Sequence, residues 1–113
     1  NSSVVLRMQY GSRTFLFTGD IEMEVEEELV NTMPEKLKCD VLKIPHHGAS
    51  TSSTSAFIRA TGAKYGAIMV YAMNDINVIN RYKALGTKVH LTSVDGTALF
   101  LTDGQSLQYA KSK

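Results

Sequence analysis

The chain has 113 residues, of which 43% are hydrophobic and 20% are charged, and its formal net charge is +1. This length suits one domain with a modest core. The near-neutral net charge gives no electrostatic reason to expect binding to nucleic acid or to a membrane surface. The single cysteine excludes an internal disulfide, and every apolar run is too short for a transmembrane helix. The first residue is not methionine and a strand pattern follows almost at once, so we expect a piece of a longer protein.

Two strands and an acidic helix are predicted in the first third of the chain. Residues 4–10 alternate between apolar and polar side chains, and residues 14–17 are more uniformly apolar, with a turn at Gly11-Ser12 between them. From Ile21 the apolar residues recur every three or four positions, until Met33-Pro34 ends the pattern. We expect an amphipathic helix whose solvated face carries five glutamates: Glu22, Glu24, Glu26, Glu27 and Glu28.

Strands and helices alternate through the middle of the chain. Short apolar runs predict buried parallel strands at 41–44, 65–71 and 88–91. A helix through residues 57–60, ended by Gly62, is predicted between the first two strands. A second helix, capped by Asn74 or Asp75 and ended by Gly86, is predicted before the third strand, with a buried stripe of Val78, Tyr82 and Leu85.

The end of the chain has the pattern of short antiparallel strands. Asp95-Gly96 and Asp103-Gly104 are both turn signals of the hairpin type, and they flank or separate apolar runs at 97–101 and 106–109. Taken with the preceding elements, this predicts an α/β fold with a mixed sheet and flanking helices.

Two apolar runs end abruptly in residues that bind metals or transfer protons. Thr18-Gly19-Asp20 follows the second strand, and His46-His47-Gly48 follows the third. Successive parallel strands have their carboxyl ends on one edge of a sheet, so Asp20 is expected to face both histidines across a crevice. A carboxylate with imidazoles suits zinc, manganese or iron. Two alternatives stay open, because Asp20 could be only a helix cap and the histidines could be structural.

A run of small hydroxyl residues follows the histidines and precedes a predicted helix. Ser50, Thr51, Ser52 and Ser53 would then lie where unpaired N–H groups favour an anion, such as a substrate phosphate. The alternative is a plain capping and loop role, which a serine-rich turn also serves. Two further residues are predicted to be structural: His90 within a strand, and Cys39 in the core.

These motifs resemble the metallo-β-lactamase superfamily, and more narrowly its ComEC-type branch, a hydrolase domain joined to membrane proteins of DNA-uptake competence. The resemblance rests on residues 1–7, on Phe15 to Asp20, on Leu42 to Gly48 with the following serines, and on residues 88–97. It covers nearly the whole chain, but only the carboxyl half of that domain. Residues 1–113 would thus be a single partial domain, the C-terminal half of an αββα sandwich.

The resemblance also implies a hydrolytic site with one or two zinc ions and phosphodiester chemistry on a DNA-like substrate. Asp20 matches the carboxylate that bridges the metals, and His46 and His47 match the segment that supplies a metal ligand and a contact to the scissile phosphate, with His47 the favoured ligand. Ser50, Ser52 and Ser53 would lie near the substrate.

Two parts of the family's pattern are absent from the chain. No His-x-His-x-Asp-His motif occurs, and residues 71–77 contain no histidine where the family tends to carry one. We therefore expect this segment to be inactive alone, and to need the missing amino half or to self-associate over an uncovered apolar sheet face. The alternative function is a non-catalytic α/β module that binds an anion or a partner.

Overall fold

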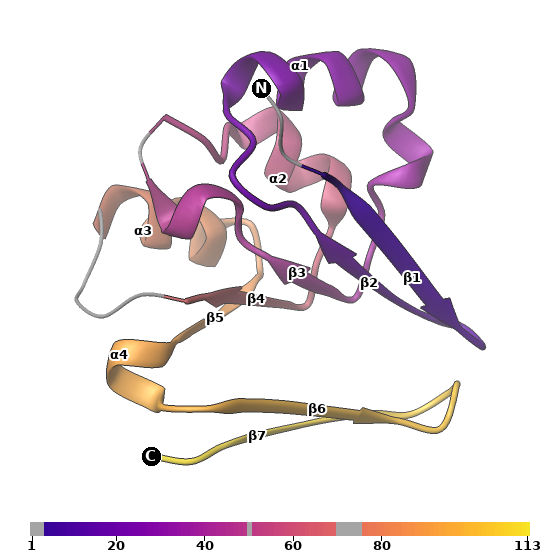
Figure 1. Cartoon of the computed structure of the whole chain (residues 1–113), viewed down its shortest axis with the longest axis vertical. Helices are drawn as coiled ribbons and strands as arrows, with labels where there is room; N and C mark the ends of the chain where they lie inside the picture. Colours follow the sequence, from indigo (N-terminus) through magenta and orange to yellow (C-terminus); the bar gives the residue numbers. More distant parts are fainter. Residues whose placement is uncertain (1–3, 50, 70–75) are drawn as a thin grey trace.

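A mixed five-stranded sheet is the framework of the chain. The computed structural model describes residues 4–49, 51–69 and 76–113. Strand β1 (Leu6–Tyr10) pairs antiparallel with β2 (Arg13–Phe17), and β3 (Val41–Lys43), β4 (Tyr65–Ile68) and β5 (Lys88–Leu91) follow in parallel in that order. The predicted α/β fold with a mixed sheet is confirmed (Figure 1).

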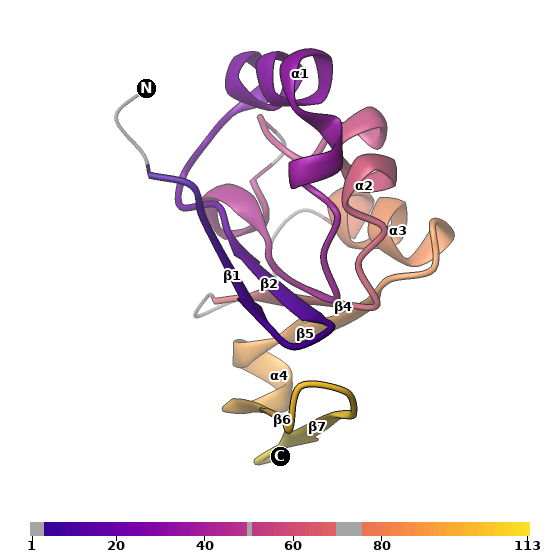
Figure 2. The same ribbon diagram turned by 90° about the vertical axis from the view of Figure 1, so that its right-hand side faces the viewer.

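Three helices pack on one face of this sheet. They are α1 (Met23–Thr32), α2 (Ser55–Thr61) and α3 (Ile76–Ala84), and Figures 1 and 2 show all three on the same side. Two short 3-10 turns, η1 (Pro34–Lys36) and η2 (Pro45–Gly48), connect the elements. None of the helices in the described ranges is long and apolar enough to cross a bilayer. The core combines strand residues Leu16, Leu42 and Ile68, and Ile44 just after β3, with helix residues Phe57, Ile58, Val78, Ile79 and Tyr82.

Most of the predicted helix ends that lie within the described residues are observed, but one residue of the predicted buried stripe of α3 is exposed. Gly62 closes α2 in the left-handed conformation, as expected, with φ of 52°. Leu85 lies beyond the end of α3 and is exposed, so its place in the buried stripe is wrong. The expected caps of α3, Asn74 and Asp75, lie outside the described residues, as does the predicted continuation of β4 through residues 70 and 71.

Glu26 contradicts the prediction of a uniformly solvated glutamate face on α1. Its relative exposure is 0%, and its two carboxylate oxygens accept hydrogen bonds from the backbone N–H groups of Ser53, at 2.5 Å, and Thr54, at 2.9 Å. A side chain of α1 therefore satisfies the unpaired donors just before α2, the role that a cap normally has within its own helix. Burial raises the pKa of Glu26, and the two backbone hydrogen bonds oppose that rise.

Cys39 and His90 are both structural, as predicted. The Cys39 thiol is buried in the core, where loss of solvation raises its pKa to about 12. His90 is buried in β5, with Nδ1 2.6 Å from the Tyr109 hydroxyl and Nε2 2.8 Å from the Gly96 carbonyl oxygen. Both ring nitrogens of His90 are thus used inside the fold.

The second sheet face is partly covered by a separate hairpin. A short helix, α4 (Thr92–Asp95), leads into β6 (Ala98–Thr102), which pairs antiparallel with β7 (Leu107–Lys111) below the main sheet (Figures 1 and 2). Asp103-Gly104 forms the hairpin turn as predicted, whereas Asp95-Gly96 ends α4 and joins no hairpin. The Leu91 N–H donates to the Asp95 carboxylate at 3.1 Å, so this aspartate folds back on its own helical turn.

Two groups of contacts fix the hairpin to the sheet. The rings of Phe100 and Tyr109 lie 5.5 and 5.2 Å from that of Tyr65, measured between centroids. At the far end the hairpin turn meets the β1–β2 turn, where the Ser12 N–H donates to the Gly104 carbonyl oxygen at 2.6 Å. The hairpin therefore lies across the sheet face and is attached at its middle and at its turn.

Candidate functional site

The loops after β2 and β3 meet at one edge of the sheet. Because these strands are parallel neighbours, both chains leave the sheet at the same edge. The His46 N–H donates to the Gly19 carbonyl oxygen at 2.9 Å, and the Met23 N–H donates to that of Thr51 at 3.1 Å. These backbone bonds hold the two loops together. Asp20 lies next to His47, as the sequence predicts, but the prediction that it also faces His46 is wrong.

His47 is the histidine that faces Asp20. Its Nε2 lies 3.6 Å from an Asp20 carboxylate oxygen, and its Nδ1 lies 2.9 Å from the Met69 backbone carbonyl. A carbonyl can only accept, so Nδ1 carries the proton, and in the neutral ring Nε2 keeps its lone pair on the side of Asp20. This is the orientation that a metal-binding imidazole takes when a backbone carbonyl holds its other nitrogen.

His46 faces a different set of groups. Its Nδ1 lies 3.2 Å from the Thr51 hydroxyl and 3.4 Å from a Glu22 carboxylate oxygen. Glu22 is also the residue at the N-cap of α1, so the alternative interpretation of Asp20 as that cap is wrong. The pair is therefore split, with His46 toward α1 and His47 toward Asp20.

Both histidines have a backbone conformation that is unfavourable for their residue type. Their φ angles are both 51°, in the left-handed region, and the φ of Gly48 is 78°. A non-glycine residue there costs roughly 1–2 kcal/mol, so surrounding contacts must maintain it. Backbone bonds around the turn provide them, including one from Ala49 N–H to the His46 carbonyl at 2.9 Å. Strain of this kind clusters at functional sites, which favours a functional role for the turn.

The serines after the histidines have structural contacts. Ser52 and Ser53 are buried; the Ser52 hydroxyl donates to the Ile21 carbonyl at 2.6 Å, and the Ser53 hydroxyl lies 2.7 Å from that of Tyr82. Ser50 lies outside the described residues. The substrate contacts predicted for these serines stay predictions, and the burial of two of them agrees with the alternative of a capping and loop role.

The separation of Asp20 and His47 is close to that of two ligands on one zinc ion. Two ligand atoms about 2.0–2.1 Å from one tetrahedral zinc ion are about 3.3 Å apart, close to the observed 3.6 Å. A catalytic zinc needs three protein ligands, and within residues 4–49, 51–69 and 76–113 no group of three His, Cys, Asp or Glu could hold a metal ion. A zinc ion bound by this pair would therefore need at least one further ligand.

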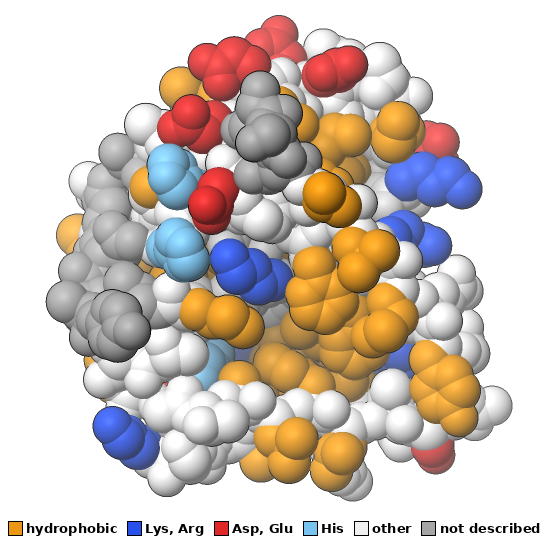
Figure 3. Space-filling view, in the orientation of Figure 1, with side chains coloured by type: hydrophobic (Ala, Val, Ile, Leu, Met, Phe, Trp, Pro, Cys, Tyr) orange, Lys and Arg blue, Asp and Glu red, His pale blue; other side chains and the backbone are white. Residues whose placement is uncertain are grey.

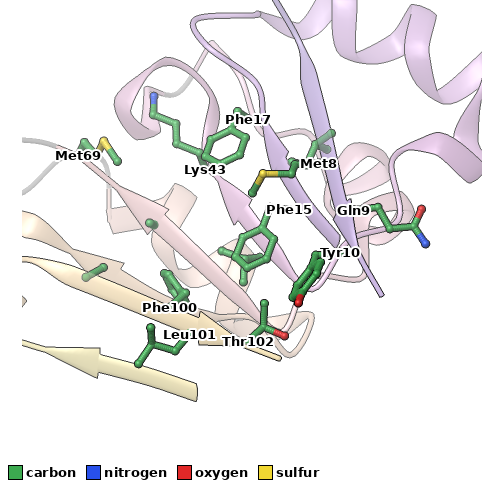
Figure 4. Close-up of a pocket in the computed structure, with 14 residues that line it drawn as sticks. Met8, Gln9, Tyr10, Phe15, Phe17, Lys43, Met69, Phe100, Leu101 and Thr102 are labelled. Atoms are coloured by element: carbon green, nitrogen blue, oxygen red, sulfur yellow. The ribbon is translucent and has the colours of Figure 1, made fainter. Parts of the chain in front are cut away.

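An apolar groove adjoins this pair on the open face of the sheet. The groove has a volume of about 700 Å³ and lies between the sheet and β6. Its lining includes Met8, Tyr10, Phe15, Phe17, Met69 and Phe100 (Figure 4). Met8 is 48% and Phe17 39% exposed, and Figure 3 shows hydrophobic side chains gathered beside the histidine and acidic side chains. The sheet face that was expected to be uncovered is therefore open only in part, because the β6–β7 hairpin covers the rest.

Sequence reasoning missed the groups that orient the two histidines. The Met69 carbonyl is a backbone group, which no residue type signals, and Glu22 was assigned only to a solvated helix face. The position of Glu22 only two residues after Asp20 was the one sequence signal that could have placed Glu22 near the histidines.

The chain is similar to competence-related proteins. It is 43% identical over 68 residues to ComE operon protein 3 of Bacillus subtilis (strain 168), covering 60% of this chain and 9% of that protein. It is 35% identical over 103 residues to Competence protein ComA of Neisseria gonorrhoeae, covering 87% and 15%. It is 33% identical over 64 residues to Uncharacterized protein YcaI of Escherichia coli (strain K12), covering 57% and 8%.

The chain thus spans between 8% and 15% of the length of these curated relatives. No family model matches the chain. No solved structure matches it either.

Proposed function

We propose that this chain is part of a metal-dependent hydrolase domain of the metallo-β-lactamase type, in a competence-related protein that cleaves phosphodiester bonds of DNA. The similarity to ComE operon protein 3 and Competence protein ComA supports the competence context. The observation that carries the chemistry is the orientation of His47, whose Nδ1 contacts a carbonyl while Nε2 faces Asp20 at 3.6 Å. In this proposal the missing amino half of the domain supplies the remaining metal ligands.

Each group at the edge has a defined part in the proposed hydrolysis. The Asp20 carboxylate and the His47 Nε2 would hold zinc, which when bound lowers the pKa of water and polarises a phosphoryl oxygen. The Met69 carbonyl fixes the His47 ring by accepting from Nδ1. His46 lies beside Thr51 and Glu22 and next to His47 in the chain, and in this proposal it would contact the phosphate.

Zinc titration tests this proposal directly. The whole protein, expressed with the sequence that flanks this chain in its gene, is titrated with Zn²⁺ by calorimetry as wild type, His47→Ala, Asp20→Asn and His46→Ala. We expect His47→Ala and Asp20→Asn to weaken zinc binding by more than the roughly 10- to 100-fold that loss of an outer-shell partner costs. His46→Ala should weaken it less, because His46 faces Glu22.

A matched variant and an activity assay complete this test. Glu35→Gln removes an exposed carboxylate on η1 and should leave zinc affinity unchanged. Hydrolysis of bis(p-nitrophenyl) phosphate and of a DNA oligonucleotide should stop in EDTA and return with zinc. Equal zinc affinity in wild type and His47→Ala would contradict the proposal.

The apolar groove supports a second candidate function, a module that binds a protein partner without catalysis. A contiguous apolar surface beside a polar edge is typical of an interaction site. In this case binding of the partner should be unchanged in EDTA, which distinguishes it from the metal-dependent hydrolase.

The same surface predicts that the isolated chain self-associates. By size-exclusion chromatography with light scattering, we expect a mass above the 12.4 kDa of one chain. The double variant Met8→Lys with Phe17→Lys should shift the mass to that of the monomer, because it places two charges on the groove. Met23→Lys, at an equally exposed position on α1, is the control and should leave the mass unchanged. A wild-type monomer would rule out self-association.

A further inference from the structure

Lys43 lines the apolar groove and ends the strand that leads into the histidine turn. It is the last residue of β3, aligned with Phe17 on one side and Ala67 on the other, so all three side chains point to the groove face. Figure 4 shows the Lys43 side chain between Phe17 and Met69, with its ammonium at the end of the groove away from Tyr10 and Thr102. That end leads into the turn that carries the histidines.

The site and the groove share a residue. Met69 lines the groove together with Lys43, and its carbonyl oxygen is the group that Nδ1 of His47 contacts at 2.9 Å. The groove that Lys43 lines therefore includes the residue that orients His47.

The charge of Lys43 stands out in this setting. Of the fourteen residues that line the groove, Lys43 is the one that carries a charge. It is only partly exposed, and the residues that the structure describes form no ion pair with it. A lysine that is partly removed from water and set among apolar side chains is usually neutralised by an anion. The open groove leaves room for that anion to come from a ligand.

A phosphodiester is the anion that fits this position. A phosphodiester carries a single negative charge, which the Lys43 ammonium would attract from the groove side, while zinc on the Asp20–His47 pair would offset the Asp20 carboxylate. We propose that the Lys43 ammonium donates a hydrogen bond to a non-bridging phosphate oxygen and so positions a phosphodiester against the Asp20–His47 pair. This assignment rests on the proposed hydrolase function, and it makes Lys43 a determinant of specificity for anionic over neutral esters.

The test compares an anionic and a neutral ester as substrates of the whole zinc-loaded protein. Lys43→Gln should raise KM for bis(p-nitrophenyl) phosphate by about 10- to 100-fold, the range for loss of a hydrogen bond to a charged group. Its kcat/KM for p-nitrophenyl acetate should stay within about twofold of wild type, because a neutral ester gains little from the cation. Lys43→Arg keeps the charge and should restore most of the affinity for the phosphodiester.

Two controls distinguish phosphate binding by Lys43 from a general effect of removing a positive charge and from a folding defect. Lys83→Gln removes an exposed lysine from α3 and should change neither substrate's kinetics. A general structural defect in Lys43→Gln would slow both substrates equally, and would overturn the assignment, as would an unchanged KM for the phosphodiester.

A binding measurement tests anion binding by Lys43 independently of any hydrolytic activity. Dibenzyl phosphate is titrated into the metal-free protein by calorimetry. In one outcome, wild type with zinc hydrolyses no phosphodiester but binds dibenzyl phosphate about tenfold more tightly than Lys43→Gln. This would support the anion site at Lys43 and contradict the hydrolase proposal. In the other outcome, wild type hydrolyses phosphodiesters and Lys43→Gln does so with the same KM. This would support the hydrolase proposal and contradict the anion site at Lys43.

Discussion

Replacing Glu26 by alanine is expected to lower the free energy of unfolding by about 3 to 5 kcal/mol. The substitution removes the acceptor of two buried N–H groups, those of Ser53 and Thr54, and each unsatisfied buried donor costs about 1–3 kcal/mol. Urea denaturation followed by circular dichroism measures the loss.

The control for this prediction is another glutamate of the same helix. Glu27→Ala removes an exposed carboxylate of α1 and should change the unfolding free energy by no more than about 0.5 kcal/mol. A Glu26→Ala variant within 1 kcal/mol of wild type would mean that water or a rearranged backbone satisfies both donors.

The pH dependence of the Glu26→Gln variant checks the same network. Burial raises the folded-state pKa of Glu26 above its unfolded value of about 4.5, so its stabilising effect is complete below about pH 4.5 and is lost as the pH rises through the folded pKa. Glutamine does not titrate. The stability difference between wild type and Glu26→Gln should therefore be largest below about pH 4.5 and should narrow as the pH rises through the raised folded-state pKa.

Gly11→Ala is the second substitution for which we expect a large effect, a loss of about 3 kcal/mol in unfolding free energy. Gly11 has a φ of 59°, and a Cβ added to it would overlap the backbone of Gly104 in the hairpin turn. Both the left-handed conformation and the overlap with rigid backbone are unfavourable. Faster hydrogen exchange of the β6 and β7 amides would locate the damage in the hairpin.

Gly62→Ala separates the two causes of that loss. Gly62 has a similar φ of 52°, but a Cβ added there would meet nothing within 4 Å. We expect it to cost only about 1 kcal/mol, from conformation alone. Equal losses in both variants would show that the contact between the two turns contributes nothing.

The order of elements could be predicted because local patterns determine it. Uniform apolar runs predicted β3, β4 and β5, and turn residues such as Gly11, Gly62 and Gly104 marked where elements end. Asp95-Gly96 was misassigned, since the same dipeptide can end a helical turn or form a hairpin, and its carboxylate accepts from Leu91 in the helical case.

The meeting of Asp20 with His47 was also predictable, because it follows from parallel strand topology alone. The burial of Glu26 was not, since it depends on the N–H groups of a segment 27 residues away in the chain. The orientation of His47 depends on the Met69 carbonyl, and that of Lys43 on which sheet face stays open. The burial and orientation of these side chains are determined by tertiary contacts, which the spacing of residues in the sequence does not predict.

The burial of Cys39 gives the chain an internal reporter of its own opening. It is the single cysteine in the sequence, and with a pKa of about 12 almost none of it is thiolate at neutral pH. Alkylating reagents should therefore modify it only in molecules whose core has transiently opened. The rate of Cys39 modification then measures the population of that open form without denaturant. A substitution that weakens the packing of α1 on α2 should therefore increase the rate of Cys39 modification, even though the substituted residue does not contact Cys39.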